Sequence, residues 1–150
     1  MLTVDYLILA DWAEIVGGKS YIQGGGWDRL NVANGFPHQR SIGIAVGIEV
    51  PWDATNRRYP LSIKVVNEDT RQDLFGADGV IEAGRPPGIP AGSAQLVQLA
   101  LNGIGNFEST GEFTVLVAID GEPARRRPFR VVDASLPPMS RSQPRHEGPP

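Results

Sequence analysis

The sequence predicts an all-β protein, folded as a two-sheet antiparallel β-sandwich of about eight strands. The first observation is that apolar residues alternate with polar or small residues in several segments, which is the period of a half-buried strand. The second is that 18 glycines and 13 prolines interrupt these segments at short intervals. Many short strands separated by turn residues are typical of sandwiches and barrels.

The strongest alternation lies in residues 41–50 and places five aliphatic side chains on one face: Ile42, Ile44, Val46, Ile48 and Val50. The opposite face holds Gly43, Ala45 and Gly47, whose small size would let another segment approach closely. Residues 61–65 and 113–119 repeat the alternation. Residues 91–101 contain alanine and glutamine, which favour helix, but they lie between a proline-rich loop and Asn102-Gly103. We therefore expect a strand there.

Two short turns predict β-hairpins. Gly17-Gly18 and Asp120-Gly121 each provide two residues that tolerate the positive φ angles of a type I′ turn. The first would join strands 4–16 and 20–23, and the second would join 112–119 and 125–132. A third turn at 67–71 would join 61–66 to 72–82. Residues 84–92 (GRPPGIPAG) are too rich in proline and glycine to pair, so we expect a loop that crosses between sheet regions.

The chain is expected to form one domain over residues 1–132, followed by a disordered, proline-rich tail over residues 133–150. A chain of 150 residues with 41% hydrophobic residues can bury a core without a disulfide or metal. The tail contains five prolines and two large apolar residues, Leu136 and Met139. Such a segment buries too little surface to offset the entropy lost on ordering.

Composition excludes or disfavours several classes of function. The chain has no cysteine, which excludes disulfides, thiolate nucleophiles and cysteine-ligated zinc. A net charge of −3 and a pI of about 5.3 disfavour a nucleic-acid partner. We expect the one basic cluster, Arg125–Arg127 with Arg130, to face water on an exposed strand. The N-terminus lacks a basic signal region, and no apolar stretch approaches the roughly 20 residues that span a bilayer. We therefore expect a cytoplasmic protein without a membrane partner.

We expect no catalytic, metal-binding or cofactor-binding residues. Gly24-Gly25-Gly26 lacks the following helix and the Gly-Lys-Ser/Thr sequence of a phosphate-binding loop, so we interpret it as a glycine-rich bulge under Trp27. His38 is the one histidine of the predicted domain, and a single histidine without cysteine is no recognisable zinc set. We expect it in a solvated loop. Carboxylates near residues 68–73 lack the alternation of a calcium loop.

A weak contact surface is expected on loops, at five residues: Trp27, Asp28, His38, Trp52 and Asp53. Trp52 gives the strongest hint, because an exposed loop tryptophan is typical of an interface. The aromatic residues Trp12, Tyr21 and Tyr59 would also suit a sugar-stacking platform. Packing is the favoured interpretation, with Trp12 in the core and the other tryptophans partly buried.

Two stretches, VDYLILADWAEIVGGKSYIQGGGWD and GEFTVLVAIDGEPARRRPFRV, resemble an uncharacterised family of small bacterial all-β domains. The family has a GGGWD-type element and a closing hairpin of the form Asp-Gly followed by Pro-Phe-x-Val. The resemblance covers residues 2–132, and it implies fold boundaries but no activity. The closing segment also resembles the last hairpin of immunoglobulin-like sandwiches, although Phe113 lacks the hydroxyl of the usual corner tyrosine. A jelly-roll-like arrangement stays open.

These observations favour a non-catalytic binding or assembly module over an enzyme. Its expected partner is another protein or a second copy of itself. Two alternatives stay open. One is a small enzyme that acts on a polar, carbohydrate-like substrate through loop carboxylates and His38. The other is a homo-oligomeric or phage-like structural subunit that pairs through an exposed strand edge.

Overall fold

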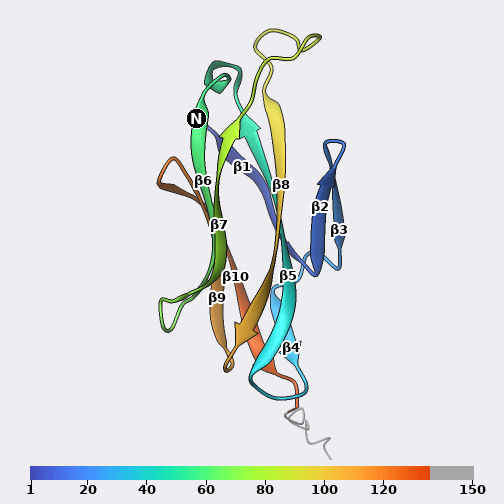
Figure 1. Ribbon diagram of the computed structural model, residues 1–150, viewed down its shortest axis with the longest axis vertical. Helices are drawn as coiled ribbons and strands as arrows, with labels where there is room; N and C mark the ends of the chain where they lie inside the picture. Colours follow the sequence, from blue (N-terminus) through green and yellow to red (C-terminus); the bar gives the residue numbers. More distant parts are fainter. Residues whose placement is uncertain (136–150) are drawn as a thin grey trace, which may run out of the picture.

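The computed structural model describes residues 1–135 (Figure 1). Within this range the chain forms ten strands and one short 3-10 helix: β1 (Thr3–Ala10), β2 (Trp12–Val16), β3 (Lys19–Gln23), β4 (Arg29–Val32), β5 (His38–Val50), η1 (Trp52–Ala54), β6 (Arg58–Asn67), β7 (Asp73–Glu82), β8 (Gln95–Phe107), β9 (Gly111–Ile119) and β10 (Glu122–Asp133). No helix in the described range has the length and apolar character that crossing a membrane requires. The predicted tail lies outside the described residues from residue 136 onward.

The strands form three layers. A five-stranded sheet has the order β4-β10-β9-β6-β7, a three-stranded sheet has the order β1-β5-β8, and β2 and β3 form a separate hairpin. Figure 1 shows the three-stranded sheet between the five-stranded sheet and the hairpin. The predicted two-sheet β-sandwich is confirmed, with ten strands in the described residues instead of about eight. Pairing is antiparallel except between β4 and β10, which are parallel over Arg29–Val32.

The core lies between the two sheets and follows the predicted alternation. The five aliphatic side chains that alternate from Ile42 to Val50 are all fully buried. Opposite them, Ile63 and Val65 of β6 and Val115 and Val117 of β9 are also buried. Full burial of such a side chain contributes about 1.5–3 kcal/mol. These layers hold the two sheets together along their length.

An aromatic cluster closes one end of the core. The Phe107 and Phe113 rings meet edge to face at 5.1 Å, and Phe113 stacks on Phe129 at 5.4 Å. Trp27, in the loop before β4, meets Phe129 edge to face at 5.7 Å. Phe107 belongs to the three-stranded sheet, and Phe113 and Phe129 belong to the five-stranded sheet. The cluster therefore joins both sheets and the glycine-rich loop.

The predicted turns are confirmed. Gly17 and Gly18 have φ angles of 57° and 74°, and Asp120 and Gly121 have 54° and 79°. In the third turn the Asn67 side-chain oxygen accepts hydrogen bonds from the amides of Asp69 and Thr70. The loop 84–92 connects β7 of one sheet to β8 of the other, as expected.

The predicted single strand over residues 4–16 is wrong, because the chain bends at Asp11. The Asp11 amide donates to the carbonyl oxygens of Gln23 and Gly24, at 3.0 and 3.2 Å. This bend ends β1 and carries β2 out of the three-stranded sheet. Residues 12–23 consequently form the third layer.

The strand expected over residues 91–101 has other bounds: it begins at Gln95 and continues past Asn102-Gly103 to Phe107. Gly103 is needed for packing: an added Cβ would lie 2.5 Å from Cδ2 of Phe75 on β7. Gly105 likewise leaves room for Phe107, with an added Cβ 2.8 Å from Cε2. At these two positions glycine is needed because aromatic rings pack against the backbone. It does not end the strand.

Candidate functional site

The five residues predicted as a contact surface lie at opposite ends of the molecule. Trp27, Asp28 and His38 lie near the end where β5 begins, whereas Trp52 and Asp53 follow the end of β5. β5 has 13 residues, which at about 3.3 Å per residue separates the two groups by about 40 Å. The structure therefore does not bring these residues into one site.

Trp27 and Asp28 border the aromatic cluster. Trp27 is partly buried, and its indole Nε1 is buried without a hydrogen-bond partner among the described residues. Asp28 is exposed and its carbonyl oxygen accepts a hydrogen bond from the Arg130 amide. Asp28 also lines a polar depression of about 260 Å³. In that depression Glu112 accepts a hydrogen bond from Nε of Arg130 at 2.6 Å.

His38 is not in a solvated loop, contrary to the expectation. It begins β5, pairs with Phe107 of β8 and is partly buried. Its Nε2 is buried, with no hydrogen-bond partner in the part of the chain that the structure describes. The strand starts earlier than the sequence pattern suggested because β8 extends far enough to pair with it.

Trp52 is engaged by its own chain. The Arg85 guanidinium lies over the indole ring, 3.8 Å from its centroid. Arg85 also donates to the Trp52 carbonyl oxygen and to the Thr55 hydroxyl, both at 2.7 Å. Trp52 is therefore partly buried, while its neighbour Asp53 stays exposed.

An apolar cavity of about 520 Å³ lies between the start of β1 and the β9–β10 turn. Its lining includes Leu2, Val4, Tyr59 and Ile119, with Asp120 and Glu122 at the turn: the apolar side chains dominate. A lining of this kind provides few polar groups to orient a substrate.

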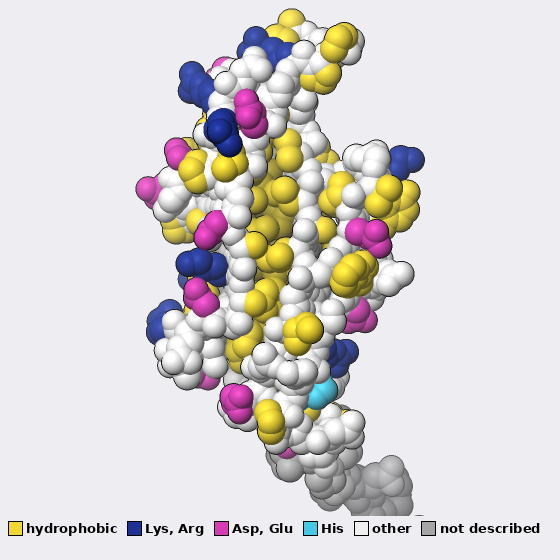
Figure 2. Space-filling model, in the orientation of Figure 1, with side chains coloured by type: hydrophobic (Ala, Val, Ile, Leu, Met, Phe, Trp, Pro, Cys, Tyr) yellow, Lys and Arg dark blue, Asp and Glu magenta, His cyan; other side chains and the backbone are white. Residues whose placement is uncertain are grey.

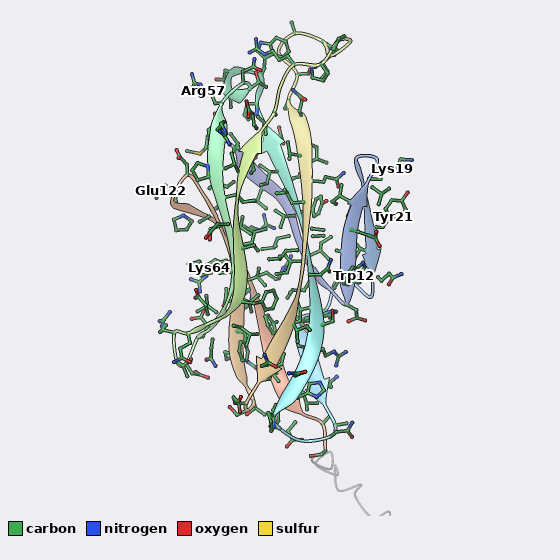
Figure 3. All side chains as sticks on the ribbon, in the orientation of Figure 1. Trp12, Lys19, Tyr21, Arg57, Lys64 and Glu122 are labelled. Atoms are coloured by element: carbon green, nitrogen blue, oxygen red, sulfur yellow. The ribbon has the colours of Figure 1, made fainter. Side chains whose placement is uncertain are left out.

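The β2–β3 hairpin presents two exposed aromatic side chains. Trp12 is 43% exposed and Tyr21 is 53% exposed. The expectation that Trp12 lies in the core is wrong, since the bend at Asp11 carries β2 outward. The strand pairs Trp12–Gln23 and Glu14–Tyr21 place six side chains on the outer side, here called the hairpin face: Trp12, Glu14, Val16, Lys19, Tyr21 and Gln23. Figure 3 shows Trp12, Lys19 and Tyr21 on this hairpin.

The other side of the hairpin rests on small residues of the three-stranded sheet. The register across that sheet aligns Ala10, Gly43 and Asn102 in one row and Ile8, Ala45 and Ala100 in the next, and both rows lie on the face toward the hairpin layer. An added Cβ at Gly43 would lie 2.8 Å from both the Ala13 nitrogen and the Trp12 carbonyl carbon. The predicted close approach to the glycine-bearing face is therefore confirmed, and β2 is the segment that approaches.

Two side chains of β8 fasten the hairpin at its base and at its turn. At the base, the Asn102 Oδ1 accepts from the Ala13 amide at 3.0 Å, and its Nδ2 donates to the Ala13 carbonyl oxygen at 2.7 Å. At the turn, Nε2 of Gln98 donates to the Gly18 carbonyl oxygen at 2.6 Å. The Tyr6 hydroxyl donates to Oε1 of Gln98. The hairpin face is consequently held in one orientation.

Some charged groups of the described residues are paired within the chain. The Thr114 hydroxyl, and then Arg126 and Arg71, hold the pKa of Glu68 below its usual range. Hydrogen bonds from Ser135 lower the pKa of Asp133. The four arginines of the basic cluster are exposed, as expected. Arg126 nevertheless pairs with Glu68, and Arg127 donates to the Leu7 carbonyl oxygen. In the described range no three His, Asp or Glu side chains gather to hold a metal ion.

The hairpin face could have been found from the sequence. A two-residue turn at Gly17-Gly18 fixes the register, so Trp12, Glu14 and Tyr21 must share a face with Lys19. A face that carries charged side chains is the solvent side of a strand pair. That argument would have placed Trp12 outside the core.

The molecule is thus a two-sheet β-sandwich that carries a fastened surface hairpin. The chain belongs to DUF6941, a family of unknown function, whose model matches residues 5–132. No curated protein matches the chain. Among solved structures, it is similar to the Pseudomonas fluorescens alkylpurine DNA glycosylase AlkC bound to DNA containing an abasic site analog. The identity is 13% and the TM-score 0.42, and the match covers 87% of this chain and 30% of that one.

Proposed function

We propose that the protein is a non-catalytic binding module that holds another protein through the hairpin face. The observation that carries this proposal is the exposure of Trp12 and Tyr21 on a hairpin fastened at both ends. Tryptophan and tyrosine are enriched at protein interfaces and dominate their binding energy. They also provide large contact areas with little loss of side-chain entropy.

The polar part of the hairpin face supports a protein as the ligand. Glu14 and Lys19 offer one charge of each sign, and Gln23 offers an amide donor and acceptor. Glu14 also accepts a hydrogen bond from the Trp12 indole nitrogen at 3.1 Å, which orients that ring. Aromatic side chains interspersed with polar and charged ones are common in protein–protein interfaces.

The geometry favours this function over the enzyme alternative. That alternative depends on loop carboxylates and His38, but two of those carboxylates are engaged by cations: Glu68 by Arg71 and Arg126, and Asp73 by Lys64. Glu112, in the polar depression, is paired with Arg130. The pKa shifts of Glu68 and Asp133 are downward, whereas a general acid needs a raised pKa.

The test compares the full chain with the double variant Trp12→Ala/Tyr21→Ala. A partner captured by the wild-type protein from its native cells is identified, purified and titrated calorimetrically against each form. We expect the double variant to bind at least tenfold more weakly, which corresponds to about 1.4 kcal/mol or more. Val80→Ala removes an equally exposed apolar side chain on β7 and is expected to bind like the wild type.

Equal affinity of the wild type and the double variant would overturn the proposal. Loss of binding in both the double variant and Val80→Ala would also count against it. Circular dichroism of each variant is compared with that of the wild type, so that an unfolded variant is not read as a binding defect. Failure to find any partner that binds the purified wild type would favour the enzyme or the structural alternative.

A further inference from the structure

Strand β8 is an edge of the three-stranded sheet, and its backbone has a partner strand on one side only. It pairs with β5 over all 13 residues, and no other backbone hydrogen bond joins it to the described residues. Its sequence, QLVQLALNGIGNF, contains neither a charged residue nor a proline. At about 3.3 Å per residue this edge is about 40 Å long. Long, uncharged edges are the ones that pair with another chain.

The other edges of the two sheets are protected. β1 carries Asp5 and a β-bulge, and Nη2 of Arg127 donates to the Leu7 carbonyl oxygen on this strand at 3.2 Å. β4 has four residues. β7 carries three carboxylates: Asp73, Asp78 and Glu82. Charge, bulges and short length are the usual means of preventing edge pairing, and β8 has none of them.

The core is also open to solvent between β7 and β8, and we call this opening the seam. On β8, Val97, Leu99 and Leu101 pack against the core but stay partly exposed. On β7, Ala77 is exposed, and an added Cβ at Gly79 would meet no atom within 4 Å. Figure 2 shows a band of hydrophobic atoms along this face, between the two sheets. The uncharged edge and the apolar seam therefore form one continuous surface.

We propose that a second copy of this chain covers the seam, with the two β8 strands paired antiparallel about a twofold axis. A twofold axis brings the same patch of both copies together, so a charged strand would face its own charge. β8 meets this requirement because it carries no charge. The pairing would join the two three-stranded sheets into one continuous six-stranded sheet and cover the β8 side of each seam. Residues 136–150 are a poor alternative occupant, since their five prolines cannot donate to a strand ladder.

The test is the oligomeric state of the full chain by sedimentation velocity, over a series from about 1 to about 100 μM. We expect a species of twice the 16.2 kDa monomer mass to form as the concentration rises. The double variant Leu96→Lys/Ile104→Lys places charges at two exposed positions of β8, 50% and 61% exposed in the wild type. It should sediment as a monomer throughout, because like charges would meet across the twofold axis. Val16→Lys, at a position 54% exposed on the hairpin, should leave the dimer intact.

A wild type that stays monomeric at the highest concentration would overturn the proposal, as would a dimer that persists in the double variant. If circular dichroism shows that the double variant is unfolded, amide hydrogen exchange of the wild type decides the question. Protection of β8 amides should then rise with concentration, and unchanged protection would contradict the pairing. The proposal is independent of the hairpin face: Trp12→Ala/Tyr21→Ala should sediment like the wild type even if it binds no partner.

Discussion

Two glycines within strands show how differently single residues constrain this molecule. Gly43 lies under β2, where an added Cβ would come within 2.8 Å of backbone atoms. Gly79 lies at the seam, where an added Cβ would meet nothing within 4 Å. Neither has the positive φ that favours glycine. The difference between them is therefore steric.

We expect Gly43→Ala to lower the free energy of unfolding by about 1–3 kcal/mol, because the backbone of β2 must move to admit the methyl group. Gly79→Ala is expected to change it by less than about 0.5 kcal/mol. Urea unfolding followed by circular dichroism measures both values. An equal decrease in the free energy of unfolding in the two variants would contradict the conclusion that close packing of β2 on Gly43 excludes a side chain there.

The β2–β3 hairpin is an element without a place in either sheet. Asn102 takes the role of a neighbouring strand, because its amide satisfies both the N–H and the carbonyl group of Ala13. Gln98 does the same for the carbonyl group of Gly18. Side chains, rather than a backbone ladder, thus determine the orientation of this element.

Asn102→Ala should lower the free energy of unfolding by about 1–3 kcal/mol, because it leaves the Ala13 backbone N–H and carbonyl groups without their hydrogen-bond partner. Amide hydrogen exchange should become faster in residues 12–23 than elsewhere. Asn106→Ala is the matched control, because Asn106 lies on the same face of β8 but is exposed. If both variants exchange like the wild type, Asn102 does not fasten the hairpin.

At the scale of the whole molecule, one core and one aromatic cluster join the two sheets. Phe107, Phe113 and Phe129 connect strands from both sheets, and Trp27 adds the glycine-rich loop. Phe129 is 2% exposed and contacts two other rings of this cluster. Loss of the Phe129 ring should therefore destabilise both sheets together.

Phe129→Ala is expected to destabilise the protein by about 3–5 kcal/mol. Unfolding should remain one cooperative transition that circular dichroism and tryptophan fluorescence report at the same urea concentration. Phe75→Ala should destabilise the protein less than Phe129→Ala, because Phe75 is only partly buried, beside the seam. Two separate transitions in the wild type would show that the sheets do not unfold together.

The fold class was predictable because its evidence is local. The alternation from Ile42 to Val50 and the paired turn residues at Gly17-Gly18 and Asp120-Gly121 each act within a few positions. The bend at Asp11 and the extension of β8 through Gly103 depend on segments far away in the chain. A strand pattern looks the same whether the strand joins a sheet or leaves it.

The same limit applies to the candidate site. Trp52 has the sequence context of an exposed loop residue, but Arg85, 33 positions away, covers its ring. Trp12 lies in an apolar context, yet the structure exposes it. The sequence shows which residues can make a contact, and tertiary neighbours determine which of them are available.

The packing of the β2–β3 hairpin on the three-stranded sheet has an evolutionary consequence. Its inner residues and the small residues beneath it are constrained by the fold, whereas Trp12, Lys19 and Tyr21 stand outside that constraint. Under the proposed function, substitutions there should alter recognition while leaving folding intact. If the hairpin face is the binding surface proposed above, relatives of this chain can differ in their partners at these positions and keep the same scaffold.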